Sequence, residues 1–220
     1  MLRKYFKYFL YLAISIGFSS SNAGSYEDFF TAIKRDDPSS VLGVLLRGFD
    51  PNSVTPDGQT GLILALRDGS LKAAEVLIDV PQTDVEIRNR QDESALMMAA
   101  LKGHLGLVRK LLQRGADVNK PGWAPLHYAA TGGHAEILRL LLDEHAYIDA
   151  PSPNGTTPLM MAAHYGTDAA VQLLLEAGAD ASLRNERGLS AQDFAMGAAR
   201  PALAEKISQH LRRQRSSGSW

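Results

Sequence analysis

The sequence contains no cysteine, and this absence removes several kinds of structure and chemistry. Without thiols the chain forms no disulfide, no thiolate nucleophile and no Cys-ligated zinc site. A one-sided charge is also lacking, since 23 Lys and Arg stand against 24 Asp and Glu in 220 residues. Proteins that bind nucleic acid usually carry a basic excess. The composition therefore predicts a protein that does not bind nucleic acid and is held together by packing.

Long apolar runs are missing too, and the most apolar stretch lies near the N-terminus. Residues 9–18 (FLYLAISIGF) follow Arg3, Lys4 and Lys7 and precede the small residues SSSNA. This three-part pattern is typical of a secretory signal peptide. As a helix, ten residues rise about 15 Å, roughly half the hydrocarbon thickness of a bilayer. We predict a signal peptide over residues 1–23, cleavage after Ala23, and no membrane insertion of the mature chain.

Export and the lack of cysteine together favour one compartment. A cysteine-free exported protein makes no use of an oxidising environment for its stability. This favours the bacterial periplasm, with secretion to the outside as the second possibility. Because the leader holds three basic and no acidic residues, the mature chain would carry 20 basic and 24 acidic residues, a net charge of −4.

The rest of the sequence repeats with a period of about 33 residues. The segment APLHYAA at 124–130 returns as TPLMMAA at 157–163 and SALMMAA at 94–100, and more weakly as TGLILA at 60–65 and SAQDFA at 190–195. The equivalent positions are Leu62, Leu96, Leu126, Leu159 and Gln192, so the step from Leu62 to Leu96 is the longest and the step from Leu96 to Leu126 the shortest. A Leu-rich block and a turn such as RGADVN at 114–119 follow the copies in fixed order.

These blocks resemble the ankyrin repeat, whose signature runs G-x-T-P-L-H-x-A-A-x-x-G-H, then a Leu-rich helix, then G-A-D-V-N. The resemblance covers about residues 26–211 and implies an all-α ankyrin-repeat solenoid of five to six stacked helix-turn-helix repeats with protruding hairpin turns. We expect an ankyrin-repeat domain over residues 24–211 with polar end repeats, then a frayed basic tail at 212–220. The expected repeats are 26–58, 59–92, 93–121, 122–154, 155–187 and 188–211.

The physics of one repeat agrees with this resemblance. Thr157 suits a helix N-cap and Pro158 the first helical position. We expect Gly166 to end that helix in a left-handed conformation and a second helix over Asp168–Glu176. A unit of about 33 residues cannot bury its own apolar face, so neighbours must stack. The longest and the shortest step leave the loop geometry open at 78–86 and 118–124.

No pattern in the sequence commits residues to catalysis or metal binding. It has no H-E-x-x-H, G-x-S-x-G, P-loop or G-x-G-x-x-G motif. His104 and His134 recur at equivalent repeat positions, which indicates a structural role, and the resemblance implies that His127 ties a helix start to its turn. Asp117 and Asp180 recur in turns, where Asp bonds its own backbone. We therefore predict no enzyme, no metal and no cofactor, with an enzyme using an unrecognised site as an alternative.

In the ankyrin family, partners usually dock on the concave side formed by turns and first helices. A Trp in a turn at 123, a Tyr near a helix end at 165 and a Leu at a slot expected to be exposed, 101, are not required by the repeat. The alternative for Trp123 is that it fills the space left by the shortened turn; Tyr128 is expected to be half-buried core. The residues predicted to bind a partner are Arg67, Arg90, Leu101, Lys102, Trp123, Thr131, Asn154, His164, Tyr165 and Arg187.

Together these features predict a monomeric, non-catalytic scaffold that binds a folded partner protein through its groove. In the periplasm it would protect, inhibit or assemble an envelope protein or toxin, and the sequence does not choose among these roles. A secreted, host-directed effector is the alternative.

Overall fold

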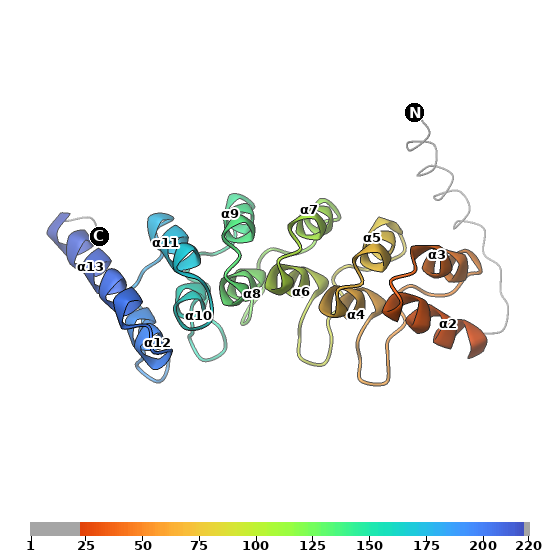
Figure 1. Ribbon diagram of the computed structural model, residues 1–220, viewed down its shortest axis with the longest axis horizontal. Coiled ribbons are helices and arrows are strands. Elements are labelled where there is room, and N and C mark those ends of the chain that lie inside the picture. The colour runs from red at the N-terminus through yellow and green to blue at the C-terminus, as the bar shows by residue number, and fades with distance from the viewer. Residues whose placement is uncertain (1–22, 218–220) are drawn as a thin grey trace, which may run out of the picture. The chain divides into compact units, whose positions relative to one another are not determined.

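The computed structural model describes residues 23–217 (Figure 1). Within that range it contains twelve α-helices and no strands; the nearest approach to a sheet is one isolated antiparallel bridge between Val54 and Thr60. The predicted signal peptide lies outside the described residues except for Ala23, the first residue of α2. The all-α fold predicted from the sequence is confirmed.

The helices form six consecutive pairs, one for each predicted repeat. The helix predicted at Asp168–Glu176 is confirmed with those bounds. The last helix runs to Ser217, so residues 212–217 continue the C-terminal helix and are not a frayed tail. The pairs are α2 (Ala23–Lys34) and α3 (Pro38–Leu46), α4 (Gly61–Asp68) and α5 (Leu71–Asp79), α6 (Ala95–Lys102) and α7 (Leu105–Gln113), α8 (Pro125–Gly132) and α9 (Ala135–Asp143), α10 (Pro158–His164) and α11 (Asp168–Glu176), and α12 (Ala191–Gly197) and α13 (Pro201–Ser217).

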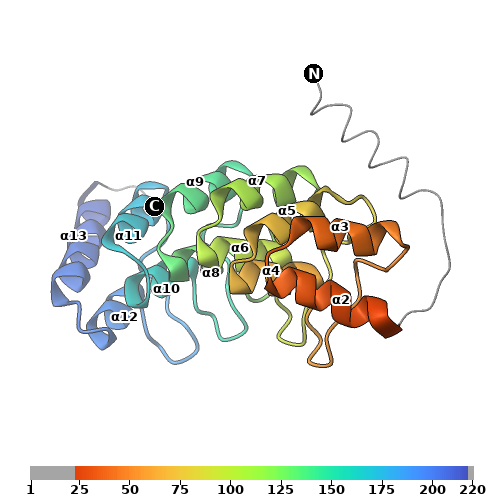
Figure 2. The same cartoon turned by 45° about the vertical axis from the view of Figure 1, so that its right-hand side comes forward.

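The described chain divides into two compact units. The first comprises the described residues up to Ala95 together with Arg109–Ala116, and the second comprises Leu96–Val108 and the described residues from Asp117 onward. In the first unit α2 packs on α3 and α4, and α5 packs on α3 and α4. In the second unit α10 packs between α8 and α12, while α11 packs on both α9 and α10 (Figure 2).

Side-chain caps start several of the helices, including the one predicted at Thr157. The Thr157 hydroxyl accepts a hydrogen bond from the Met160 amide, and Pro158 occupies the first turn, as predicted. Ser190 caps α12, and the Asp193 carboxylate accepts from the Ser190 amide at 2.8 Å, which completes a capping box. These local bonds make short helices of seven to nine residues viable, because such lengths are unstable alone.

Apolar packing between neighbouring first helices forms the core of the second unit. Leu126 and Leu159 are 1% and 0% exposed, and the paired alanines of α8 and α10 are fully buried beside them. Small alanines let the helices approach closely, and the leucines fill the space between them. This is the mutual burial that the repeat pattern predicts.

The expectation for Gly166 is wrong. Tyr165 closes α10 in the right-handed region, and Gly166 has no positive φ, whereas Gly133, at the equivalent position of the preceding repeat, has φ 71°. A Cβ at Gly166 would lie 3.0 Å from the Ala162 Cα and still closer to the Ala130 carbonyl oxygen of the preceding repeat. Glycine is therefore required here for close approach of backbone to backbone.

In three repeats of the second unit, the residue just before the second helix ties its repeat to the preceding one. His134 Nε2 donates to the Leu101 carbonyl at 3.0 Å, and the Thr167 hydroxyl donates to the Gly133 carbonyl at 3.0 Å. At the same position Arg200 donates to three carbonyls at the end of α10, at 2.9 to 3.3 Å. Each bond satisfies carbonyls that a helix end leaves unpaired. The structural role predicted for His134 is confirmed.

The turns after the second helices carry the predicted aspartate bonds. Asp117 Oδ1 accepts from the Asn119 amide at 2.9 Å, and Asp180 Oδ1 accepts from the Ser182 amide at 2.8 Å. Asn119 then reaches the next turn, where Nδ2 donates to the His145 carbonyl and Oδ1 accepts from the Tyr147 amide, both at 2.9 Å. Consecutive turns are thus joined through side chains.

Arginine replaces the missing Gly-Ala turn in the longest repeat. The chain leaves α5 through Val80 in an extended conformation. The Arg114 guanidinium donates to the carbonyls of Ile78 and Val80, the latter at 3.0 Å, and to that of Thr83 at 3.0 Å. One side chain from the following repeat therefore organises the loop that the sequence left open at 78–86.

Candidate protein-binding surface

A hollow of about 220 Å³ opens on the first-helix side of the second unit. Its walls come from three consecutive first helices and from the segment that precedes α8. We call it the Trp123 hollow. It is lined by Leu101 of α6, by Trp123 just before α8, by His127, Tyr128 and Thr131 of α8, and by Met161 of α10.

Trp123 reaches this position because the loop before α8 is short. Gly122 adopts φ 80°, a conformation that glycine tolerates. The half-buried indole then packs edge-on against His127, with ring centroids 5.2 Å apart. Trp123 therefore packs beside the shortened loop and also forms one wall of the hollow, while its contact with a partner stays a prediction.

His127 is fully buried under the hollow and bonded at both ring nitrogens. Nδ1 accepts from the Ala124 amide at 3.1 Å, and Nε2 donates to the Thr156 carbonyl at 3.0 Å. Burial lowers the pKa of His127 to about 4, so the ring is neutral near pH 7. The tie between helix start and turn that the resemblance implied is confirmed, and it extends to the next loop.

The hydroxyl of Thr131, which also lines the hollow, is hydrogen-bonded within the protein. The Thr131 hydroxyl donates to the His127 carbonyl at 2.8 Å within α8. Tyr128 is half-buried, as predicted. Since the polar atoms of His127 and Thr131 are used internally, the hollow presents mainly carbon to solvent, and such surface favours contact with apolar groups.

A second apolar surface lies beside the hollow on α10 and α12. Tyr165 is 62% exposed, and its ring centroid lies 4.2 Å from that of His164. The His164 ring also approaches Phe194 at 6.0 Å and bonds the Phe194 carbonyl through Nδ1 at 3.1 Å. His164 therefore joins two repeats and supports an exposed tyrosine.

Two members of this surface were not predicted from the sequence. Met161 and Phe194 are half-buried, and they occupy the same repeat position as Tyr128, one and two repeats further along the chain. The repeat register was the signal that could have found them, because equivalent positions on stacked first helices face the same side.

The remaining residues of the second unit that were predicted to bind a partner differ in exposure and in their bonds. Leu101 is half-buried rather than exposed, because it forms part of the wall of the hollow, while Lys102 is exposed. Asn154 is exposed, but its Oδ1 accepts from the Ser152 hydroxyl at 2.7 Å and its carbonyl accepts from the Glu186 amide at 3.0 Å. Asn154 therefore shapes its loop. Arg187 is exposed at the next loop.

Arg67 and Arg90 belong to the first unit. Arg67 Nε pairs with Asp68 at 2.9 Å. Arg90 Nη2 donates to the Pro56 carbonyl at 2.8 Å, and the stem of Arg90 lies over Gly58, where a Cβ would meet Arg90 Cγ at 2.9 Å. Both arginines are thus held by neighbouring loop or helix groups.

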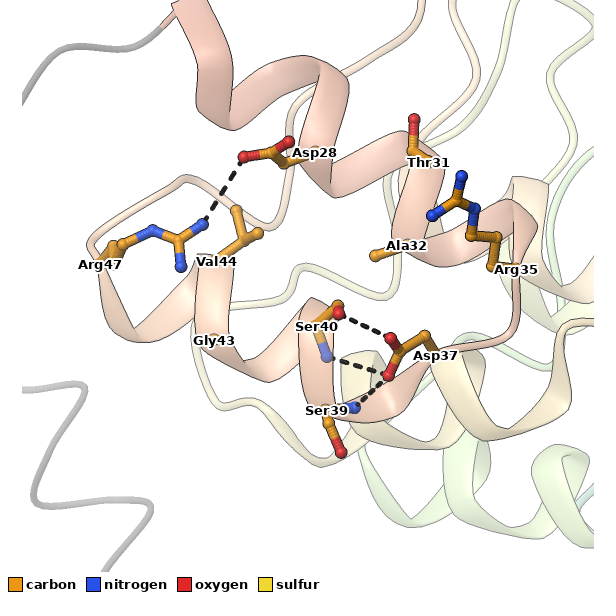
Figure 3. A pocket seen from close by; sticks show the side chains of 10 residues that line it. All are labelled: Asp28, Thr31, Ala32, Arg35, Asp37, Ser39, Ser40, Gly43, Val44 and Arg47. Carbon is orange, nitrogen blue, oxygen red and sulfur yellow. Dashed lines mark hydrogen bonds and ion pairs between the residues drawn. The ribbon is translucent and has the colours of Figure 1, made fainter.

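A larger hollow, of about 440 Å³, lies between α2 and α3 in the first unit (Figure 3). Its charges are balanced within it. Asp37 caps α3 by accepting from the Ser39 and Ser40 amides at 3.1 Å, and hydrogen bonding to Ser40 lowers the Asp37 pKa. Arg47 pairs with Asp28 at 3.9 Å. The side chains that line this hollow do not converge on a common ligand position.

Two kinds of feature are absent from residues 23–217. No three His, Asp or Glu side chains in that range gather closely enough to hold a metal ion. No helix within the same range combines the length and apolar character needed to cross a bilayer.

Comparison with known proteins identifies the family. The profile described as ankyrin repeats (3 copies) matches residues 29–121 and 117–185. The chain therefore belongs to the ankyrin repeat family, which confirms the resemblance seen in the sequence. The mouse protein fem-1 homolog A-like is 33% identical over 60% of this chain, and the mouse B-cell lymphoma 3 protein homolog is 31% identical over 67%. The chain spans only 21% and 35% of the length of these relatives.

Two solved structures from bacteria share the fold over most of their length. An ankyrin repeat domain from Acinetobacter baumannii is 26% identical with a TM-score of 0.68, covering 83% of this chain and 96% of that one. A chain in the complex of a predatory endopeptidase with an immunity protein, from Bdellovibrio bacteriovorus, is 25% identical with a TM-score of 0.71, covering 87% and 99%. Ankyrin-repeat domains are generally non-catalytic scaffolds that bind protein partners.

Proposed function

We propose that this chain is an exported, non-catalytic binding protein that holds a folded partner protein on the first-helix side of its repeats. The observation that carries the proposal is the Trp123 hollow together with the exposed Tyr165, which directly follows α10. Exposed apolar surface with aromatic side chains is characteristic of interaction sites, where Trp and Tyr often dominate binding.

The bacterial periplasm is the proposed location. The N-terminal pattern of basic residues, an apolar run and small residues supports export. The likeness to a chain from an endopeptidase–immunity protein complex supports a role in which the partner is an exported enzyme or toxin that is inhibited until needed. Protection or assembly of an envelope protein would use the same surface, as would a secreted effector that acts on a host protein.

Affinity capture from the producing cell tests the binding role. The wild-type chain and a Trp123→Ala, Tyr165→Ala double variant serve as baits, with Tyr147→Ala as the matched control. Tyr147 is 70% exposed and does not line the hollow. We expect the wild type and the control to retain one partner that the double variant loses. Equal yields of the captured partner with all three baits would show that this surface does not bind it.

Fractionation of the same cells tests the location. We expect the chain in the periplasmic fraction, with Gly24 as its first residue. Recovery of the mature chain outside the cell envelope would favour the secreted effector, and an unshortened chain in the cytosol would contradict export.

A further inference from the structure

The Trp123 hollow differs from a cofactor pocket in size and in lining. Drug-sized ligands occupy pockets of about 300–1,000 Å³ that hold a few well-placed polar groups. Here the volume is about 220 Å³, and the ring nitrogens of His127 and the hydroxyl of Thr131 are already bonded within the protein. The hollow thus has room for one side chain and offers it carbon contacts.

The segments that line the hollow contain two lysines and no acidic residue. Lys102 follows Leu101 at the end of α6 and is exposed, and Lys120 lies in the short loop that carries Trp123. No Asp or Glu occurs in the nearby segments, namely 96–102, 118–132 and 151–164.

From this combination we propose that the Trp123 hollow receives a single apolar side chain of Leu or Met size from the partner protein, with an acidic residue beside it that faces Lys102. The proposal rests on the proposed binding function and specifies the chemistry of the partner. A buried apolar anchor supplies most of the affinity in such contacts, while charges at the rim favour one partner over others.

The probe is a phage-displayed library of random twelve-residue peptides selected on the purified chain. The expected result is enrichment of peptides with Leu, Met, Ile or Phe adjacent to Asp or Glu. A dye-labelled copy of the best peptide then gives affinities by fluorescence anisotropy. A Trp220→Phe variant leaves Trp123 as the only tryptophan, because the sequence has two. Peptide binding should then change the emission of Trp123.

Matched variants locate the contact. Trp123→Ala removes a wall and Met161→Lys places a charge against the anchor, so each should weaken peptide binding at least about tenfold, as loss of a binding hot spot does. Tyr147→Ala should stay within about twofold. Lys102→Glu should weaken binding about two- to fivefold, as exposed charge pairs do, and should favour a peptide with Lys in place of its acidic residue. Circular dichroism confirms that each variant is folded.

The possible outcomes separate this proposal from the proposed function. Failure to enrich any peptide, enrichment without an apolar residue, or unchanged affinity in folded Trp123→Ala would overturn the apolar anchor. If a natural partner binds the wild type and Trp123→Ala equally, the proposed binding function survives. The hollow is then not part of the binding site, and the proposed anchor is wrong. If sedimentation shows a dimer that Trp123→Ala dissociates, a second copy fills the hollow, and the proposal is wrong.

Discussion

Protonation of His127 should destabilise the fold in mildly acidic solution. The ring is fully buried, and Nδ1 accepts a hydrogen bond from the Ala124 amide. A proton on Nδ1 would replace this acceptor by a donor facing another donor, and it would place a charge in the apolar interior. Both effects favour the neutral ring, in agreement with the lowered pKa.

The size and sign follow from the two pKa values. His has a pKa of about 6.5 in an unfolded chain, and His127 has a pKa of about 4 in the folded protein. Between these values the unfolded chain binds a proton that the folded chain does not, so stability falls as pH falls. The contribution of the neutral ring is fully present above about pH 6.5, and about 3 kcal/mol of it is lost by pH 4.

The sequence itself supplies the reference variant. Met97 and Met160 occupy the position of His127 in the two neighbouring repeats, so His127→Met removes the titration with a side chain that this fold accepts. Urea unfolding at pH 7.5, 6, 5 and 4.5 gives the free energy of unfolding of both proteins. Carboxylates titrate equally in the two, so the difference between the curves isolates His127. A pH dependence that is the same in both proteins would refute the reasoning.

Three further predictions concern the stacking of repeats. Leu126→Ala or Leu159→Ala should lower the free energy of unfolding by about 2–5 kcal/mol, and a loss below about 0.5 kcal/mol would show that these leucines do not pack between repeats. Gly166→Ala should lower the free energy of unfolding by about 1–3 kcal/mol, because the added Cβ meets the backbone of the preceding repeat. Gly106→Ala is the control and should be neutral or stabilising, because nothing lies within 4 Å of its Cβ. The opposite order of stabilities in urea titrations would contradict the close approach at Gly166. Arg200→Gln should lower the free energy of unfolding by about 1–3 kcal/mol, because the hydrogen bonds from the guanidinium to carbonyls at the end of α10 are lost. Arg212→Gln is the control, because Arg212 forms an exposed pair with Glu205, and it should have little effect in thermal unfolding. Equal losses in the two variants would show that Arg200 has no special role.

The repeat pattern was sufficient to predict the helices and their order. Features within one repeat, such as the Thr157 cap and the Asp117 turn, follow from local bonds and were predicted well. Family membership followed from the same blocks, because several copies in fixed order are more specific than any single motif.

Contacts between repeats were harder to predict. Arg200 bonds residues 34 to 38 positions earlier, and the position of Gly166 against Ala130 depends on how closely two helices pack. The spacing of residues along the sequence does not determine how closely these two helices pack. The extent of α13 was missed for a related reason, since basic and polar residues at its end are compatible with both a helix and a tail.

The candidate site was predicted in part. Trp123, Leu101 and Thr131 do meet in one hollow, and Tyr165 lies at a helix end, as predicted, and is exposed. Asn154 is exposed and also shapes its loop, since its Oδ1 accepts from the Ser152 hydroxyl and from the Thr156 amide, and its contact with a partner stays a prediction. Exposure of Leu101 was overestimated, since Leu101 forms part of the wall of the same hollow as Trp123.

The loop at 118–124 belongs to the shortest step of the chain, from Leu96 to Leu126, and its shortness has a consequence for how such a protein can change. Lengthening it to match the equivalent segment at 148–157 would move Trp123, which belongs to this loop, and would reshape one wall of the hollow. The walls that come from α6 and α10 would stay in place, because Leu101 and Met161 belong to stacked helices. Recognition can therefore change through loop length, since loops tolerate insertions more readily than the helices that carry them.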